Sequence, residues 1–264
     1  MSVKAYDRVR AAREKNRPTG LDYIRTLFGT FLECHGDRRY ADDPAIVGGI
    51  AEFQGRPVTV IAIEKGHTTK ERLFRNFGAP NPEGYRKAIR LMMQAEKFHR
   101  PVICFVDTSG AFCGVGAEER GQGQAIAESM STMMALNTPV LSIVIGEGGS
   151  GGALALSVAD EVWMLENAIY SVISPEGCAS ILWKDAGRAD EAADCLKLTA
   201  DSALTFGLIE QVIPEHGGDR ELTFAALHQR ISAWLRQERN PEECAQARYR
   251  RFREIGTEFI QHGN

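Results

Sequence analysis

Residues 146–156 decide the fold and read Gly-Glu-Gly-Gly-Ser-Gly-Gly-Ala-Leu-Ala-Leu. They follow the apolar run Pro139–Ile145, which is typical of a buried strand, and the Ala/Leu segment at their end favours a helix. Glycine has no Cβ atom, so a ligand atom can approach its N–H directly. The first N–H groups of a helix also lack intrahelical partners and lie at the positive end of its dipole. This junction is therefore expected to bind a phosphate or to stabilise an oxyanion.

The chemistry of this loop allows three interpretations. It contains no Lys followed by Ser or Thr, so it is not a Walker A phosphate loop, and an oxyanion hole is favoured. The glycines could instead serve only close packing of a helix on a strand. The spacing Gly148-x-Ser150-x-Gly152 also fits the nucleophile elbow of α/β-hydrolases. That hydrolase needs a later acid and histidine, for which Asp160 or Asp201 with His216 have the right order.

A second glycine-rich loop repeats the pattern earlier in the chain. The apolar strand expected at Pro101–Asp107 leads into Thr108–Gly116, and a helix is expected over Ala117–Leu136. Short apolar strands that alternate with helices are typical of a sheet covered on both faces. The sequence therefore predicts an α/β core in which two glycine loops follow strand ends.

The remaining elements follow from periodicity and from turn and cap residues. Strands are expected at Ile46–Phe53, Pro57–Glu64, Val140–Ile145, Glu161–Leu165, Ile169–Ile173 and Ile209–Ile213. Helices are expected up to Arg17 and over Leu21–Leu32, Glu83–Phe98, from Ser150 to about Ala159, from Ser174 onward and over Asp190–Leu208, with a polar helical tail over Arg220–Phe259.

The connection from Lys65 to Pro82 is rich in cations. Long connections in compact domains tend to be functional. Cations beside an oxyanion site suggest an anionic ligand, such as the phosphates of coenzyme A or a carboxylate. Lys65 and Arg72 are the candidates for that contact, and a merely solvated charged loop is the alternative.

Composition excludes several classes of protein. A formal net charge of −4 gives no indication of nucleic-acid binding, and no apolar run approaches the roughly 20 residues of a membrane span. The start of the chain lacks an apolar signal core, so a cytoplasmic location is expected. The six cysteines include no Cys-x-x-Cys pair, and no metal motif is present, so no metal site is expected on this chain. Neither glycine loop contains a histidine, which favours chemistry that needs an oxyanion hole but no protein base.

Six segments between Pro18 and Pro214 resemble the α subunits of bacterial acetyl-CoA carboxylase carboxyltransferases. They are Leu21–Tyr23, Gly36–Arg38 with Tyr40–Ile50, Arg75–Gly78 with Pro82–Lys87, Gly114–Gln122, Gly146–Leu154 and Tyr170–Lys184. The resemblance implies a crotonase-like α/β fold, a spiral of ββα units with helical N- and C-terminal extensions. Residues 1–20 would form the N-terminal extension, and residues 21–264 a single carboxyltransferase domain.

The resemblance also implies a reaction and partners. The carboxyl group of carboxybiotin, borne on a biotin carboxyl carrier protein, would pass to acetyl-CoA and give malonyl-CoA, the first step of fatty acid biosynthesis. A β subunit would carry the zinc ribbon, biotin carboxylase would complete the complex, and an α2β2 heterotetramer is expected.

Site residues follow from the same resemblance. Gly151 and Gly152 would donate their N–H groups to the ureido oxygen of biotin, and biotin itself would be the base. The other residues expected to line the cofactor site are Gly114, Val115, Gly116, Gly148 and Gly149, with Lys65 and Arg72.

The chain departs from the family pattern in its first glycine loop. The family usually reads Asp-Thr-Pro-Gly-Ala-Tyr-Pro-Gly-Val-Gly, whereas this chain has Ser109, Phe112 and Cys113. Two further alternatives therefore remain open: carboxylation or decarboxylation of another acyl-CoA, and a non-catalytic paralogue that binds or regulates a partner.

Overall fold

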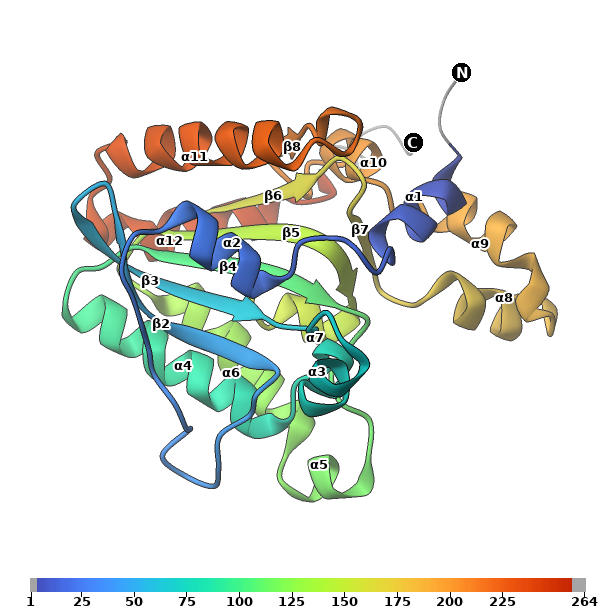
Figure 1. The fold of residues 1–264 in the computed structure, drawn as a ribbon, viewed down its shortest axis with the longest axis horizontal. Helices are drawn as coiled ribbons and strands as arrows, with labels where there is room; N and C mark the ends of the chain where they lie inside the picture. The colour runs from blue at the N-terminus through green and yellow to red at the C-terminus, as the bar shows by residue number, and fades with distance from the viewer. Residues whose placement is uncertain (1–3, 258–264) are drawn as a thin grey trace.

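One mixed sheet of eight strands organises the computed structural model, which describes residues 4–257 (Figure 1). The strand order is β1-β2-β3-β4-β5-β6-β8, and β7 pairs with the far end of β5. The strands are β1 (Phe31–Glu33), β2 (Ile46–Phe53), β3 (Arg56–Ile63), β4 (Val102–Thr108), β5 (Val140–Gly149), β6 (Glu161–Leu165), β7 (Ile169–Ser171) and β8 (Gln211–Ile213). The pairs β1–β2 and β2–β3 are antiparallel, and the other pairs are parallel.

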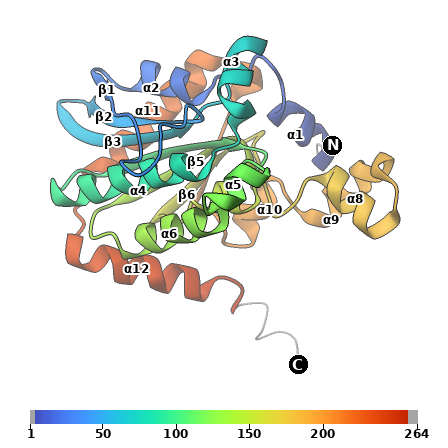
Figure 2. The same ribbon diagram turned by 90° about the horizontal axis from the view of Figure 1, so that it is seen from below.

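Helices cover both faces of this sheet, as Figures 1 and 2 show from two directions. Helices α4, α6 and α12 lie on one face, and α2 and α11 lie on the other. Helices α8 and α9 extend away from the sheet and pack near α1. The bounds are α1 (Ala5–Ala12), α2 (Gly20–Leu27), α3 (Thr69–Phe74), α4 (Pro82–Lys97), α5 (Val115–Glu119), α6 (Gln122–Ala135), α7 (Ser150–Leu154), α8 (Pro175–Trp183), α9 (Ala189–Leu196), α10 (Ala200–Thr205), α11 (Arg220–Arg236) and α12 (Pro241–Glu254). Short 3-10 turns lie at Asn76–Gly78, Ala186–Arg188 and His216–Gly218.

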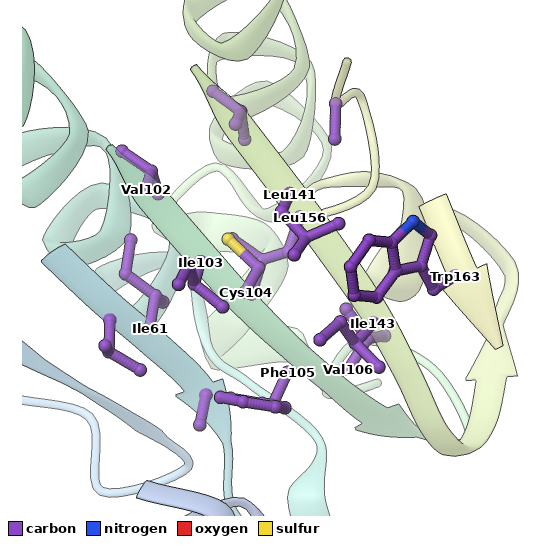
Figure 3. Packing of buried hydrophobic residues seen from close by; sticks show 14 of the residues in the cluster. Ile61, Val102, Ile103, Cys104, Phe105, Val106, Leu141, Ile143, Leu156 and Trp163 are labelled. Atoms are coloured by element: carbon purple, nitrogen blue, oxygen red, sulfur yellow. The ribbon is translucent and has the colours of Figure 1, made fainter. Parts of the chain in front are cut away.

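The core sits on both sides of the central parallel strands (Figure 3). Every residue of β4 is buried, so its sequence is a continuous apolar run that ends in Asp107 and Thr108. Strands buried on both faces have this composition because each side chain, up or down, meets a helix layer. The expected α/β core is confirmed.

The hairpin of β2 and β3 was predicted closely. Its turn residues Gln54 and Gly55 both have positive φ, 52° and 78°. A two-residue turn of that kind matches the right-handed twist of the flanking strands. Together with α4, the hairpin forms a ββα unit.

The helix expected over Leu21–Leu32 is wrong beyond Leu27. Helix α2 ends there, and Phe28 is extended, with φ −118° and ψ 148°. The next residue, Gly29, donates its N–H to the carbonyl of Glu52, and the chain continues as β1. The apolar spacing runs on past Leu27, but Phe28 and Phe31 pack on the core from an extended backbone, and Leu32 is exposed, which the spacing alone does not distinguish.

Three other helices are shorter than expected. The helix expected over Ala117–Leu136 is divided at Gly121, whose φ of 80° is left-handed. The helix expected to reach Ala159 ends at Leu154, and the one over Asp190–Leu208 is interrupted at Lys197, where φ is 51°. In each case a local backbone turn overrides a continuous helical composition.

The C-terminal segment is more than a polar tail. It comprises α11 and α12, and α11 buries Leu227, Ile231 and Trp234 in the main core. Arg248 on α12 is buried and donates to the carbonyls of Leu136 and Thr138, which follow α6. Phe259, the expected end of the tail, lies outside the described residues. The division at residue 20 stays a prediction.

No membrane-spanning helix is found within residues 4–257. None of the helices in this range combines the length and the apolar character that crossing a bilayer requires.

Candidate active site

The carboxyl ends of three neighbouring strands bring a buried charge cluster together. Lys65 follows β3, Asp107 lies near the end of β4, and Glu147 lies near the end of β5. The Lys65 Nζ atom is 2.7 Å from Asp107 Oδ1 and 3.0 Å from Glu147 Oε2. Asp107 Oδ1 also accepts the backbone N–H of Glu147 at 2.8 Å. Parallel strands end at the same sheet edge, which is why residues so distant in sequence meet.

Burial and charge act in opposite directions on this cluster. Burial lowers the pKa of the Lys65 ammonium, but the two carboxylates outweigh it, so that pKa lies above its ordinary value. Burial raises the pKa of Glu147, and the cations Lys65 and Arg13 outweigh it, so that pKa is lowered. Lys65 and Glu147 are therefore both charged at neutral pH.

Arg13 extends the cluster to the N-terminal helix. Its Nε donates to Glu147 Oε1 at 2.8 Å, and its Nη1 donates to Glu176 Oε1 on α8 at 2.7 Å. Burial lowers the pKa of Arg13, but the hydrogen bonds to the carboxylates of Glu176 and Glu147 outweigh it. The pKa of Arg13 therefore lies above its ordinary value. The segment after α1 is thus tied both to the glycine loop and to the projecting α8.

The loop after β5, Gly146–Gly152, comprises the end of β5 and the first turn of α7, and it packs backbone against backbone on the loop after β4, Ser109–Gly116. A Cβ atom on Gly152 would lie 2.6 Å from the nitrogen of Ala111 and 2.8 Å from the carbonyl carbon of Gly110. A Cβ on Gly149 would collide with the carbonyl of Ser109. Real Cβ atoms do not approach backbone this closely, so close packing accounts for the glycines at 149 and 152.

Gly151 differs from its neighbours. A Cβ atom on it would meet only the side chain of Ile126, at an ordinary 3.6 Å. The carbonyl of the next residue, Gly152, accepts the hydroxyl of the buried Tyr85 at 3.4 Å. Packing therefore does not explain the glycine at 151, and its N–H lies in the first turn of α7, where intrahelical partners are missing.

Gly151 faces a largely apolar cavity of about 380 Å³. Its walls come from α7, β6, β7, the segment after α10, and α12 with the residue that follows it. The lining residues are Ser150, Gly151, Leu154, Ser157, Val162, Tyr170, Ser171, Val172, Leu208, Arg251, Phe252 and Ile255. The Arg251 guanidinium is engaged with Glu210, at 2.6 Å and 3.0 Å, so the cavity presents mainly apolar walls with Gly151 at one side.

The other predicted glycine positions have different surroundings. Gly148 is buried, and a Cβ on it would lie 2.8 Å from the Tyr170 ring. Gly114 has an extended backbone, with φ 179°, and begins α5. Val115 is 77 % exposed, and the carbonyl of Gly116 accepts Arg120 Nη1 at 2.6 Å. Within the described part of the chain, positions 114–116 line neither the apolar cavity nor the polar cleft described next.

The two predicted cations line a separate polar cleft of about 210 Å³. The cleft also receives Arg13, Arg17, Asp107 and Glu147. Arg72 donates to the carbonyls of Gly66 and Lys15, at 3.1 Å and 3.4 Å, and keeps its charge uncompensated by these contacts. Lys65, in contrast, is already matched by two carboxylates.

The hydrolase interpretation loses one of its acids. Asp160 accepts the N–H of Val140 at 2.7 Å and pairs with Arg248 at 3.0 Å. Val140 begins β5 and Ser150 follows its other end, and ten residues of strand span roughly 30 Å. Ser150 is exposed, and among the described residues no hydrogen bond joins it to His216 or Asp201.

No group of three or more His, Cys, Asp or Glu side chains suited to a metal ion occurs within residues 4–257. Lys65, Asp107, Glu147 and Arg13 are instead paired with one another.

Comparison with known proteins decides the family. A family model described as acetyl co-enzyme A carboxylase carboxyltransferase-like matches residues 1–256. The acetyl-coenzyme A carboxylase carboxyl transferase subunit alpha of Ruminiclostridium cellulolyticum is 60 % identical over 256 residues, which cover 96 % of this chain and 98 % of that protein. The subunit of the same name from Clostridium acetobutylicum is 56 % identical over 263 residues, covering 97 % and 96 % of the two chains. The chain belongs to the carboxyltransferase α-subunit family of acetyl-CoA carboxylase.

Solved structures support the fold independently. Transcarboxylase 12S matches with a TM-score of 0.67 at 20 % identity, covering 88 % of this chain and 45 % of that one. The β subunit of Pseudomonas aeruginosa geranyl-CoA carboxylase matches with a TM-score of 0.67 at 15 % identity, covering 93 % and 45 %. This chain thus spans under half of each of those proteins, and the likeness shows the fold alone. The expected crotonase-like fold is confirmed.

These findings confirm the main functional prediction. The chain is a carboxyltransferase subunit of a biotin-dependent acetyl-CoA carboxylase, which implies acyl-CoA and biotin-linked substrates and, from the name of the α subunit, a β-subunit partner. A relative from Natranaerobius thermophilus is named as subunits beta/alpha; it is 54 % identical and covers 98 % of this chain and 44 % of that protein.

Sequence reasoning did not identify Arg13, Asp107 and Glu147 as members of one cluster. A signal for two of them was present, since Asp107 ends a buried apolar strand and Glu147 is the one charged residue within Gly146–Gly152. Arg13 gave none, because its partners lie more than 130 residues away.

Proposed function

We propose that the N–H groups of Gly151 and Gly152 bind the ureido oxygen of biotin when the carboxyl group is transferred. The observation that carries this proposal is that Gly151 has no packing reason to be glycine, lies in the first turn of α7 and faces the apolar cavity. Donors fixed on a rigid backbone stabilise a developing negative oxygen without reorganisation during the reaction. The Tyr85 hydroxyl supports this arrangement, because it donates a hydrogen bond to the carbonyl of Gly152.

The apolar cavity is the proposed place for the fused rings of biotin. Its walls, which include Leu154, Tyr170 and Phe252, suit an uncharged bicyclic group whose one strongly polar edge is the ureido group. Biotin supplies the carboxyl group and also the base for the α proton of the thioester. The residues of this chain would bind the rings, orient the ureido oxygen toward α7 and exclude water.

Reaction and partners are proposed at the finer level that the family suggests. The carboxyl donor is carboxybiotin on a biotin carboxyl carrier protein, the acceptor is acetyl-CoA, and the product is malonyl-CoA. The β subunit carries the zinc ribbon and completes the site, biotin carboxylase supplies the carboxylated carrier, and the carboxyltransferase is an α2β2 heterotetramer. A cytoplasmic location stays a prediction from the sequence.

Arg72 is the proposed contact for a phosphate or carboxylate of the CoA ester. Its guanidinium bonds only backbone carbonyls in the described part of the chain, so it retains a charge to offer at the polar cleft. Gly114, Val115 and Gly116 are proposed to approach the carrier-borne substrate from the exposed loop after β4.

The test combines the purified chain with its β subunit and measures malonyl-CoA-dependent carboxylation of a biotin derivative. We expect turnover with the complex and none with either chain alone. A panel of malonyl-CoA, methylmalonyl-CoA and glutaconyl-CoA separates an acetyl-CoA enzyme from one that uses another acyl-CoA. A well-folded complex without any carboxyl transfer would contradict the proposal and favour the non-catalytic paralogue.

Ser150→Ala separates this function from the serine hydrolase. The hydroxyl has no part in carboxyl transfer here, so we expect the variant to retain most of its activity. Loss of turnover in Ser150→Ala, together with labelling of the parent chain by a fluorophosphonate, would favour the hydrolase.

A further inference from the structure

Lys65 is the only cation that bridges the two strands from which the glycine loops emerge, among the residues that the structure describes. It contacts Asp107, which lies near the end of β4, and Glu147, which lies near the end of β5. Its side chain is 19 % exposed, and those of Asp107 and Glu147 are 9 % and 12 % exposed. Two carboxylates this close and this buried would repel each other strongly without the ammonium between them.

The cluster also holds the backbone of the glycine loop. Asp107 Oδ1 accepts the N–H of Glu147 at 2.8 Å, and the same oxygen binds the ammonium at 2.7 Å. The absence of a side chain at Gly146 makes room for this carboxylate, since a Cβ atom there would collide with Asp107. Only three residues separate Glu147 from Gly151, so a shift of Glu147 is expected to displace Gly151.

The geometry assigns Lys65 as a positioning residue rather than a substrate ligand: it holds Asp107 and Glu147 together, and through them it fixes where the N–H groups of Gly151 and Gly152 point. This inference rests on the proposed function of those two groups. It separates Lys65 from Arg72, which lies on the same cleft but has no carboxylate partner in the described ion pairs. Arg13 reinforces the assembly from the other side of Glu147, at 2.8 Å.

The decisive comparison is Lys65→Met against Lys65→Arg in the complex with the β subunit. Methionine keeps the apolar stem and removes the charge, so we expect kcat to fall by roughly 10- to 100-fold, the size that a displacement of about 1 Å produces. The KM values for malonyl-CoA and for the biotin derivative should stay within about twofold, because no substrate contact is lost. Arginine restores the charge, and we expect it to recover a large part of kcat.

Two further variants control for the change in the net charge of the cleft and for the loss of a lysine elsewhere on the chain. Lys65→Met with Glu147→Gln removes one positive and one negative charge, so the cleft keeps its net charge and two negative carboxylates no longer face each other without the ammonium; kcat should remain low. Lys97→Met removes an exposed lysine on α4 and should leave kcat unchanged. If Lys65 were a substrate ligand, its loss would instead raise the KM for malonyl-CoA and leave kcat unchanged. That result, or parental kcat in either variant without Lys65, would overturn the inference.

Hydrogen–deuterium exchange on the full chain tests the same inference without any need for activity. Lys65→Met should speed exchange in the segments around residues 108–114 and 146–153, and leave the hairpin of β2 and β3 protected. Unchanged exchange in both segments would overturn the positioning role, even if the complex proved inactive. An inactive parent complex with the expected exchange pattern would instead count against the proposed function alone.

Discussion

The two glycine-rich loops follow neighbouring parallel strands, yet glycine serves a different purpose in each. In the loop after β5, the glycines let backbone meet backbone, as at Gly149 and Gly152. In the loop after β4, a Cβ on Gly110 would meet no described atom within 4 Å, and Val115 is 77 % exposed. The loop after β5 is packed at these glycines, whereas the loop after β4 packs on it at Ser109–Ala111 and is open from Phe112 to Gly116.

This difference indicates which loop can hold a precise geometry by itself. The loop after β5 is fixed by its packing and by the charge cluster of Lys65, Asp107 and Glu147. The loop after β4 presents apolar side chains, including the 37 % exposed Phe112, to its surroundings. The departures from the family at Ser109, Phe112 and Cys113 fall in the loop after β4, at positions that are exposed, although the carbonyl of Ser109 packs against Gly149.

The largest effect on stability and activity is expected for Gly152→Ala, which adds a methyl group inside the packed loop. The new methyl group would lie 2.6 Å from a backbone nitrogen that cannot move aside cheaply. We expect the free energy of unfolding to drop by about 3 kcal/mol, the upper part of the range for overpacking. Carboxyl transfer should fall by roughly 10²-fold or more, as for a lost oxyanion donor. Urea unfolding measures the change in stability, and the transfer assay measures the change in activity. A variant with the stability and the activity of the parent chain would show that the loops do not pack as described.

Gly110→Ala tests the loop after β4 at an equivalent place. No collision is expected, but its φ of 151° is a conformation that residues with a side chain rarely adopt. The added methyl group itself meets no described atom within 4 Å, so we expect a cost of about 1 kcal/mol, near the lower end for such strain. Urea unfolding decides the matter, and a cost as large as that of Gly152→Ala would remove the contrast between the loops.

Gly123→Ala tests whether a glycine is required at an exposed position of α6. Gly123 lies within α6, is exposed, and a Cβ on it would meet nothing described within 4 Å. Alanine is the better helix former by about 0.5–1 kcal/mol, so the variant should be more stable by up to that amount. A lower thermal midpoint than the parent chain would reveal a contact that this surface makes elsewhere.

The smallest change in stability is expected for Gly151→Ala, the matched control for Gly152→Ala. Its methyl group would make an ordinary 3.6 Å contact with Ile126. We expect the free energy of unfolding to stay within about 0.5 kcal/mol of the parent. Any loss of carboxyl transfer then reports on the approach of the ureido oxygen rather than on folding. Destabilisation equal to that of Gly152→Ala would contradict the different roles of the two positions.

Local sequence signals predicted much of this fold. The strands β2, β3 and β6 were placed to within a residue at each end, because apolar runs and turn residues mark them. The break at Gly121 and the strand β1 were missed, since a left-handed residue and an extended backbone after Leu27 leave no trace in apolar spacing. The family resemblance supplied the activity, which the residues alone left open among several chemistries.

The site was harder to predict than the fold because its members are distant in sequence. The glycines at 151 and 152 were named, but their different surroundings depend on Ile126 and on the backbone of Gly110 and Ala111. The sequence predicts Lys65 as a ligand because a lysine in a basic connection resembles one. Lys65 is paired with the carboxylates of Asp107 and Glu147 because the sheet brings three strand ends together, and this contact cannot be predicted from the local sequence.

The position of biotin in the assembled enzyme tests the central claim most directly. A crystal structure of the α and β subunits with biotin bound should place the ureido oxygen roughly 2.7–3.1 Å from the nitrogens of Gly151 and Gly152, inside the apolar cavity. A ureido oxygen bound by other donors, with these two N–H groups directed away from it, would contradict the account.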